Sequence, residues 1–253
     1  MGNRKALKAL VYQVAAATDR GQRMNTMIAP MYQDKLIEMK KLVDALVPQS
    51  DEITESGIQG EWELIYSSVE LFRSSPFFLA IEKALNDKTK SDLFFKLHLL
   101  QVGSFGLSTV GRVGQYINFN NAEMISTFDT TIFGLTTIPI LGWFKLLPTF
   151  GGRVVTIAKG LQLKGNNISM ELEKTKVSEV VGLGKIPLVD RLLMERWYPV
   201  NTVWKLLPWN KEKPNCEITV IYIDEELRIT RDMYGSLFVY IRPSIPLLDH
   251  TKI

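Results

Sequence analysis

The side chains that most often perform catalysis or bind metals are few in this chain and stand far apart. The sequence has two histidines, His98 and His250, and neither lies at metal-ligand spacing from a cysteine, a carboxylate or the other histidine. The acidic run at residues 224–226 falls on a predicted hairpin turn, where adjacent carboxylates point in different directions and are solvated. These residues therefore predict no metal site.

Glycine-rich segments that could hold a cofactor are incomplete. Residues 103–106 (GSFG) and 182–185 (GLGK) lack the further glycines and the Ser or Thr that dinucleotide and phosphate loops require. The sequence also has no Gly-x-Ser-x-Gly element for a nucleophilic serine. We expect a protein that is not an enzyme, with no catalytic residue and no obligatory cofactor.

A different kind of contact is indicated by Gly60 and Trp62, read together with the distant arginines Arg228 and Arg231. A Gly-x-Trp that opens a strand and an Arg on a late strand can close one end of a small antiparallel barrel, with the guanidinium over the indole. A barrel closed at one end is a cup, and a cup of this kind holds apolar ligands.

Strand alternation selects one of the two arginines. If Leu227 and Ile229 face the interior, Arg231 faces inward with them and Arg228 points outward. We therefore predict that Arg231 meets Trp62 and that Arg228 is a surface or helix-contacting residue. An Arg beside an indole in a partly desolvated site contributes about 2 kcal/mol, and we expect this pair to close the barrel without touching the ligand.

Composition is that of an ordinary folded protein. Of 253 residues, 46% are hydrophobic and 23% charged, and the net charge of +3 is far too small for a nucleic-acid footprint. The single cysteine, Cys216, excludes an intramolecular disulfide and argues against a secreted scaffold. Residues 1–17 predict neither a secretory signal peptide nor a myristoylated N-terminus.

Helical spacing precedes the strands. Apolar residues within 7–20 and 32–48 predict two helices, and we expect residues 1–49 to form a helical hairpin packed on a barrel. Ser75 and Pro76 mark the start of a third helix, which runs to about residue 86 and is expected to form a lid.

Period-two alternation and turn residues dominate the remainder of the chain. The predicted strands are 61–66, 112–119, 123–133, 153–163, 168–177, 217–224, 227–233 and 237–242. The predicted fold is mainly β with a helical N-terminus, in which residues 50–253 form an antiparallel barrel.

Two apolar segments, 132–150 and 186–209, interrupt the strands. Trp is common at membrane interfaces, and apolar connections of this length usually have a function. We predict that these segments form the barrel mouth and touch a membrane or lipid body, or a protein partner, through Trp143, Phe144, Trp197, Trp204 and Trp209. The alternative is that both segments fold over the barrel and complete its core.

Tyr66 is the predicted polar contact for a ligand, because alternation places it inward, one strand length from the closed end. Phe77 and Phe78 are further candidates for ligand contact. They could equally be core residues that fix the lid helix, a role expected for at least one of them.

Four motifs in order resemble the plastid lipid-associated protein family, also called the plastid fibrillins. They are ATDRG at 17–21, GEWELIYSS at 60–68, RSSPFF at 73–78, and YIDEELRITR at 222–231 followed by GSLFV at 235–239. Together they extend over nearly the whole chain.

The resemblance implies a lipocalin-like (calycin) barrel, located in a plastid at thylakoids or plastoglobules. It further implies that the protein binds or organises prenyl lipids, carotenoids or fatty acids without enzymatic activity, so that a bound lipid, quinone or carotenoid is a possible ligand. The alternative is an accessory subunit that docks by its apolar segments onto a thylakoid membrane protein complex. A third reading is an enzyme acting on prenyl lipids. Neither the lipid-binding function nor the accessory-subunit function involves nucleic acid.

Overall fold

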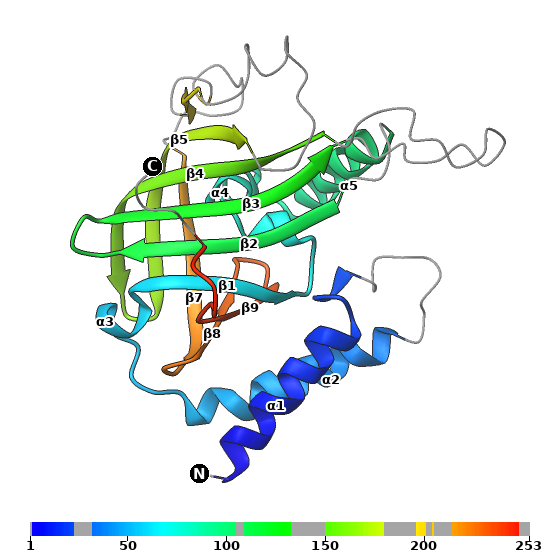
Figure 1. Ribbon diagram of the computed structural model, residues 1–253, viewed down its shortest axis with the longest axis vertical. Coiled ribbons are helices and arrows are strands. Elements are labelled where there is room, and N and C mark those ends of the chain that lie inside the picture. The colour runs from blue at the N-terminus through cyan, green and yellow to red at the C-terminus, as the bar shows by residue number, and fades with distance from the viewer. Residues whose placement is uncertain are drawn as a thin grey trace, which may run out of the picture.

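The fold is that of a computed structural model, which describes residues 2–22, 32–104, 109–132, 150–179, 196–200, 204 and 214–247. Its described strands form one antiparallel sheet in the order β4-β3-β2-β1-β9-β8-β7-β5-β6. A further pairing of β4 with β5 closes eight of these strands into a barrel, and β6 adds to the outer part of β5. The ring of strands is visible in Figure 1.

The strands are β1 (Gly60–Ser67), β2 (Thr109–Asn118), β3 (Glu123–Ile132), β4 (Phe150–Lys164), β5 (Asn167–Glu179), β6 (Tyr198–Pro199), β7 (Asn215–Ile223), β8 (Leu227–Arg231) and β9 (Leu237–Ile241). The helices are α1 (Gly2–Ala17), α2 (Gln33–Leu46), α3 (Glu55–Ile58), α4 (Pro76–Leu85) and α5 (Lys88–Ser104), with short 3₁₀ turns η3 (Val47–Gln49) and η4 (Leu71–Ser74). Figure 1 shows α1 and α2 below the strands, and α4 and α5 in the upper part of the molecule, away from α1 and α2.

The N-terminal helices cover the outer face of β8 and β9. Val11 and Val14 of α1 and Met39 of α2 are almost completely buried against Ile229 and Val239 of these strands. Each helix buries one apolar stripe against these strands. As a result, β8 and β9 are buried on both faces, by the helices on the outer face and by the barrel interior on the other. Helices α1 and α2 therefore pack on the barrel.

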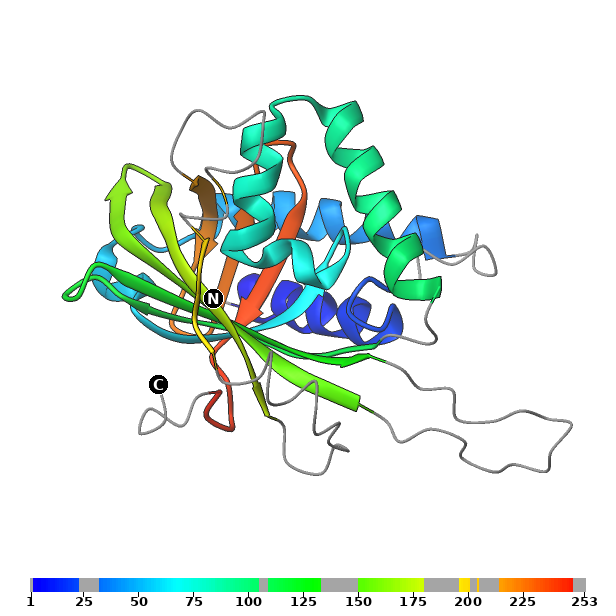
Figure 2. The ribbon, with the colours of Figure 1, turned by 90° about the horizontal axis from the view of Figure 1, so that it is seen from above.

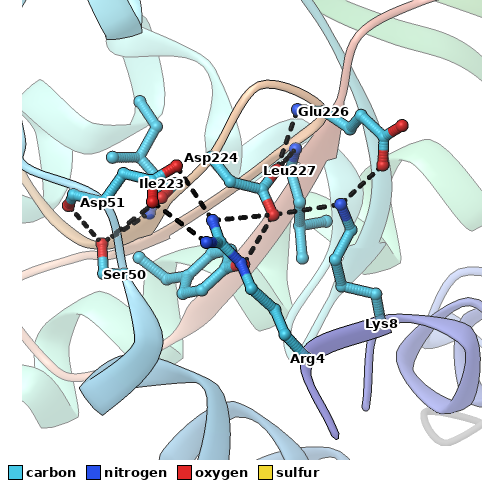
Figure 3. Close-up of polar contacts among 9 residues, drawn as sticks. Arg4, Lys8, Ser50, Asp51, Ile223, Asp224, Glu226 and Leu227 are labelled. Atoms are coloured by element: carbon cyan, nitrogen blue, oxygen red, sulfur yellow. Dashed lines mark hydrogen bonds and ion pairs between the residues drawn. The ribbon is translucent and has the colours of Figure 1, made fainter. Parts of the chain in front are cut away.

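An ionic cluster fastens α1 to the turn between β7 and β8, as Figure 3 shows. The carboxylate of Asp224 accepts a hydrogen bond from the Tyr222 hydroxyl at 2.6 Å and lies 3.0 Å from Lys8 Nζ and 3.2 Å from Arg4 Nη2. Its other oxygen accepts hydrogen bonds from the backbone of the turn. These donors lower the pKa of Asp224 to about 2 despite its burial.

The end of α1 depends on a glycine. Gly21 has a φ of +86°, and a Cβ there would lie 2.0 Å from the carbonyl oxygen of Ser67. Only glycine allows the chain to pass this close to β1. The hydroxyl of Thr18 accepts a hydrogen bond from the Gly21 amide, which stabilises the turn.

The predicted fold class is confirmed: the chain is mainly β, with an antiparallel barrel of the lipocalin-like type and helices at the N-terminus. The third predicted helix corresponds to α4, which ends at Asn86 in the left-handed conformation. Helix α5 was not expected from the sequence. None of the described helices is both long and apolar enough to cross a bilayer.

Candidate functional site

Trp62 closes one end of the barrel. Its side chain is fully buried, and its indole Nε1 donates a 2.6 Å hydrogen bond to the carbonyl of Ile58 in α3. Two guanidinium groups lie over the ring, that of Arg242 at 3.7 Å and that of Arg228 at 5.0 Å from its centroid. The indole therefore contacts two arginines, and neither is the predicted Arg231.

The register prediction for β8 was wrong. Arg228 is the residue that faces the lumen, whereas Arg231 pairs with Asp44 of α2 at 3.2 Å and its side chain is 34% exposed. The alternation argument assumed that Leu227 and Ile229 face the barrel interior. They instead pack under the α1–α2 hairpin, because β8 is buried on both faces.

Arg228 belongs to a buried polar network. Its Nη2 donates a 2.5 Å hydrogen bond to the side-chain oxygen of Gln115, whose amide nitrogen donates to the Tyr240 hydroxyl and to the backbone oxygen of Ser74. The Arg228 guanidinium also lies 4.4 Å from the Tyr240 ring centroid. Burial lowers the pKa of Arg228 to about 10.

Gly60 has a structural reason to precede this tryptophan. Its φ is +102°, and a Cβ there would lie 2.9 Å from Nη1 of Arg242. Arg242 uses that nitrogen to reach the carbonyl oxygens of Gln59 and Glu61. The glycine thus lets the guanidinium approach the strand and cover Trp62.

Tyr66 does not face the lumen, so its predicted orientation was wrong. The pairing of β1 with β9 shifts register between Leu64 and Tyr66, and this irregularity turns Tyr66 to the outer face beneath the N-terminal hairpin. Its hydroxyl is buried and has no hydrogen-bond partner in the part of the chain that the structure describes, and burial raises its pKa to about 12. A bulge of one residue leaves no signal in the alternation of the sequence.

The lumen is filled by side chains from its own wall. Inward-facing residues such as Met124, Ile168 and Leu172 are 0% exposed and belong to one apolar cluster. A cavity of water size would expose the atoms that line it. These residues therefore show that the part of the lumen they line is packed.

Helix α4 is part of that packing. Its Leu79 and Ala80 are buried in the lumen cluster, and its Lys83 pairs with Glu217 of β7 at 3.3 Å. In Figure 2, α4 lies against the strands and α5 lies outside it. An occupant of the lumen must therefore displace α4 or the side chains that α4 covers.

The two phenylalanines of α4 take part in packing. Phe78 joins Phe72 and Phe95 in a buried aromatic cluster, with ring centroids 4.7 Å and 6.0 Å away. Phe77 is partly buried and contacts both this cluster and the lumen cluster. Phe77 is therefore the better placed of the two for contact with an occupant of the lumen.

Two of the predicted membrane-contact residues lie in the described part of the chain. Trp204 is only 4% exposed and packs in the lumen cluster, as the alternative interpretation expects for this residue. Trp197 is partly buried on the outer wall, with the ammonium groups of Lys174 and Lys176 each 4.8 Å from its ring. Trp143, Phe144 and Trp209 lie outside the described residues.

The outer surface carries an open groove of about 680 Å³. Residues of α1, β1 and β9 line it, and these include the apolar Ile65 and Ile241. The charged residues that line it include Asp19 and Glu226. It is a second place where a small molecule of mixed character could lie, separated from the lumen by the barrel wall.

The described residues contain no group of three or more His, Cys, Asp or Glu side chains arranged to hold a metal ion. Sequence reasoning missed the network of Arg228, Gln115 and Arg242 and the buried carboxylate of Glu82 on α4. The only sequence signal for this network was the place of Arg228 between the apolar residues Leu227 and Ile229. The face of β8 on which Arg228 lies was misread, because the helices that cover the outer face were not taken into account.

A closed antiparallel barrel, with an end closed by an indole that contacts two arginines and with helices covering it, defines a protein of the lipocalin-like class. The chain belongs to the PAP_fibrillin family, whose model matches residues 5–241. This is a family of plastid lipid-associated proteins that are not known as enzymes. The comparisons with curated proteins and with solved structures gave no match.

Proposed function

We propose that the protein binds one apolar small molecule, such as a prenyl lipid, carotenoid or fatty acid, in the barrel lumen at thylakoid or plastoglobule surfaces. The observation that supports this most directly is the continuous apolar cluster inside the barrel, to which Leu79 and Ala80 of α4 and Trp204 contribute without being part of a barrel strand. Their departure leaves apolar surface that a ligand covers again, and each Å² so covered contributes about 25 cal/mol.

A photoactivatable fatty acid that carries a diazirine on its chain tests where the ligand lies. The protein is irradiated with the probe, digested, and the modified peptides are identified by mass spectrometry. Modification within β3, β5 and β7 at lumen-facing positions supports the proposal. Modification confined to the outer groove near Tyr12 and Ile65, or no saturable modification, contradicts it.

A second function is favoured by one observation, the packed lumen. A barrel that is packed where its described residues line it can serve as a rigid body that docks onto a thylakoid membrane protein complex, and then needs no small molecule. Native mass spectrometry of the protein purified from its plastid distinguishes the two functions. Retained lipid or pigment supports the carrier, whereas a ligand-free protein recovered with a membrane complex supports the docking function.

A further inference from the structure

Ionisable groups are buried at the point where α4 meets the end of the barrel. Glu82 of α4 is 2% exposed, Asp232 in the β8–β9 turn 6%, and Arg73 of η4 7%. Arg73 Nη2 lies 2.5 Å from Glu82 Oε1, and the Ser91 hydroxyl of α5 donates to the same oxygen at 3.5 Å. Glu82 thus joins α4 to η4 and α5.

The two carboxyl groups face each other with an incomplete set of donors. Asp232 Oδ1 accepts hydrogen bonds from the backbone amides of Tyr234 and Ser236, while its Oδ2 is buried and receives none from the described residues. The side chains of Glu82 and Asp232 are close enough to hydrogen-bond. A proton on Glu82 supplies the donor that Asp232 Oδ2 lacks, and removes one of two adjacent buried charges.

We propose that a proton on Glu82, donated to Asp232 Oδ2, holds α4 on the barrel, and that loss of this proton releases α4 and opens the lumen. The release of α4 stands on the geometry of the pair. Its consequence, that pH controls ligand access, rests on the proposed function.

The surrounding charges do not neutralise the pair. Arg73 is the cation in contact with it, and its other terminal nitrogen lies 3.5 Å from Glu70. The other titratable groups near this end of α4 include Asp87, Asp92 and Tyr234, and Lys88 lies 3.1 Å from Asp92. Arg73 is divided between Glu70 and Glu82, which favours retention of a proton on the pair.

Burial and the facing Asp232 raise the pKa of Glu82 to about 7, against the opposing effect of Arg73. A solvated Glu82, with α4 released, has an ordinary pKa near 4.5. The closed state therefore binds more protons than the open state between these values. Opening of α4 should increase as pH rises from about 4.5 to about 7, by at most about tenfold per pH unit, and level off above.

Cys216 is a native reporter of this opening. It lies at the start of β7, fully buried in the lumen cluster, next to the Glu217 that pairs with Lys83 of α4. Burial raises the pKa of its thiol to about 12, so it is unreactive while α4 is in place. Release of α4 exposes it to a maleimide.

The experiment measures the rate of Cys216 modification by N-ethylmaleimide from pH 5.5 to 8 without any ligand, divided by the rate for N-acetylcysteine at each pH. We expect the normalised rate to rise about tenfold or more up to pH 7 and then to level off. Insensitivity of the rate to about 1 M urea shows that the opening is local and that the barrel stays folded.

Three variants separate the pair from general stability. Glu82→Gln carries a neutral donor at every pH and should give a low, flat profile. Asp232→Asn keeps the oxygen that accepts from the turn amides and should move the rise to lower pH. Lys83→Gln removes an exposed ion pair of the same helix and should keep the wild-type pH profile.

A flat wild-type profile, or the wild-type rise retained in both Glu82→Gln and Asp232→Asn, overturns the proposal. Because the labelling needs no ligand, its result is independent of whether the lumen binds one. A normal labelling profile in a protein that the diazirine probe never modifies within the lumen refutes the proposed function and leaves the proton-dependent release of α4 standing.

Discussion

At the scale of single residues, Arg228 and Arg231 of the same strand serve different parts of the molecule. Arg228 lies between Trp62 and Tyr240 inside the barrel, and Arg231 pairs with Asp44 at the surface. A three-residue separation puts them on opposite faces of β8. Trp62 could be placed from the sequence, but its partner could not, because alternation identifies two faces without saying which one lines the lumen.

Replacement of each arginine by alanine measures this difference. Arg228→Ala leaves a cavity beside Trp62 and an unpaired oxygen on Gln115, and should lower the free energy of unfolding by about 3 kcal/mol. Arg231→Ala should lower it by about 1 kcal/mol or less, since the pair it breaks is exposed. Urea unfolding followed by tryptophan fluorescence gives both values, and equal losses would contradict the register of β8.

Two tyrosines beneath the hairpin form a second matched pair. Tyr66→Phe removes a buried hydroxyl that has no partner among the described residues, and should leave the free energy of unfolding unchanged or raise it by about 1 kcal/mol. Tyr222→Phe removes a hydroxyl bonded to Arg4 and Asp224, and should lower it by about 1 to 3 kcal/mol. Thermal and urea unfolding test the contrast; a Tyr66→Phe protein as unstable as Tyr222→Phe would argue for a partner of Tyr66.

At the scale of elements, the ionic cluster on Asp224 holds α1 against the barrel. The pKa of Asp224 is lowered from 3.8 to about 2. The contribution of this carboxylate to the free energy of unfolding is therefore present above about pH 4 and is lost as pH falls through about 2. The contribution is about 2 kcal/mol. Wild-type protein should therefore lose stability between pH 4 and pH 2 more steeply than Asp224→Asn, which is already weakened at pH 6.

Unfolding by urea at several pH values checks this prediction, with Asp51→Asn as the control. Asp51 also pairs with Arg4, but its side chain is 54% exposed and its loss should change the pH profile little. Parallel pH profiles for wild type and Asp224→Asn would mean that the cluster does not hold α1 in place.

The elements differ in how well the sequence predicted them. Helices α1, α2 and α4 have distinct apolar stripes and stop signals, and their approximate limits could be read directly. Helix α5 was missed because its apolar residues follow no single face, so that its partners, such as the Phe72 and Phe78 rings around Phe95, become apparent only in three dimensions. The bulge before Tyr66 was missed because it depends on pairing with β9.

At the scale of the whole molecule, the barrel is closed at one end by Trp62 and covered at the other by α4. The family and the fold were predictable because the motifs that carry them are local and ordered along the chain. The packed lumen was not, since filling depends on how α4 and Trp204 enter it. Binding of an apolar molecule in such a barrel requires that α4 moves.

A crosslink that fixes α4 tests this claim most directly. In a Cys216→Ala background, Lys83→Cys and Glu217→Cys are joined by a short bismaleimide, which ties α4 to β7. The control joins Lys159→Cys to Glu123→Cys, an exposed pair on the neighbouring strands β4 and β3, which stay together in any case.

The measurement is the affinity of the crosslinked and uncrosslinked proteins for a fluorescent long-chain fatty acid, with a prenylquinone as competitor. If the lumen is the binding site and α4 its gate, the Lys83–Glu217 crosslink should weaken binding at least about tenfold, a cost of about 1.4 kcal/mol, while the control crosslink leaves it unchanged. Undiminished binding with α4 fixed, or no saturable binding before crosslinking, would contradict the account.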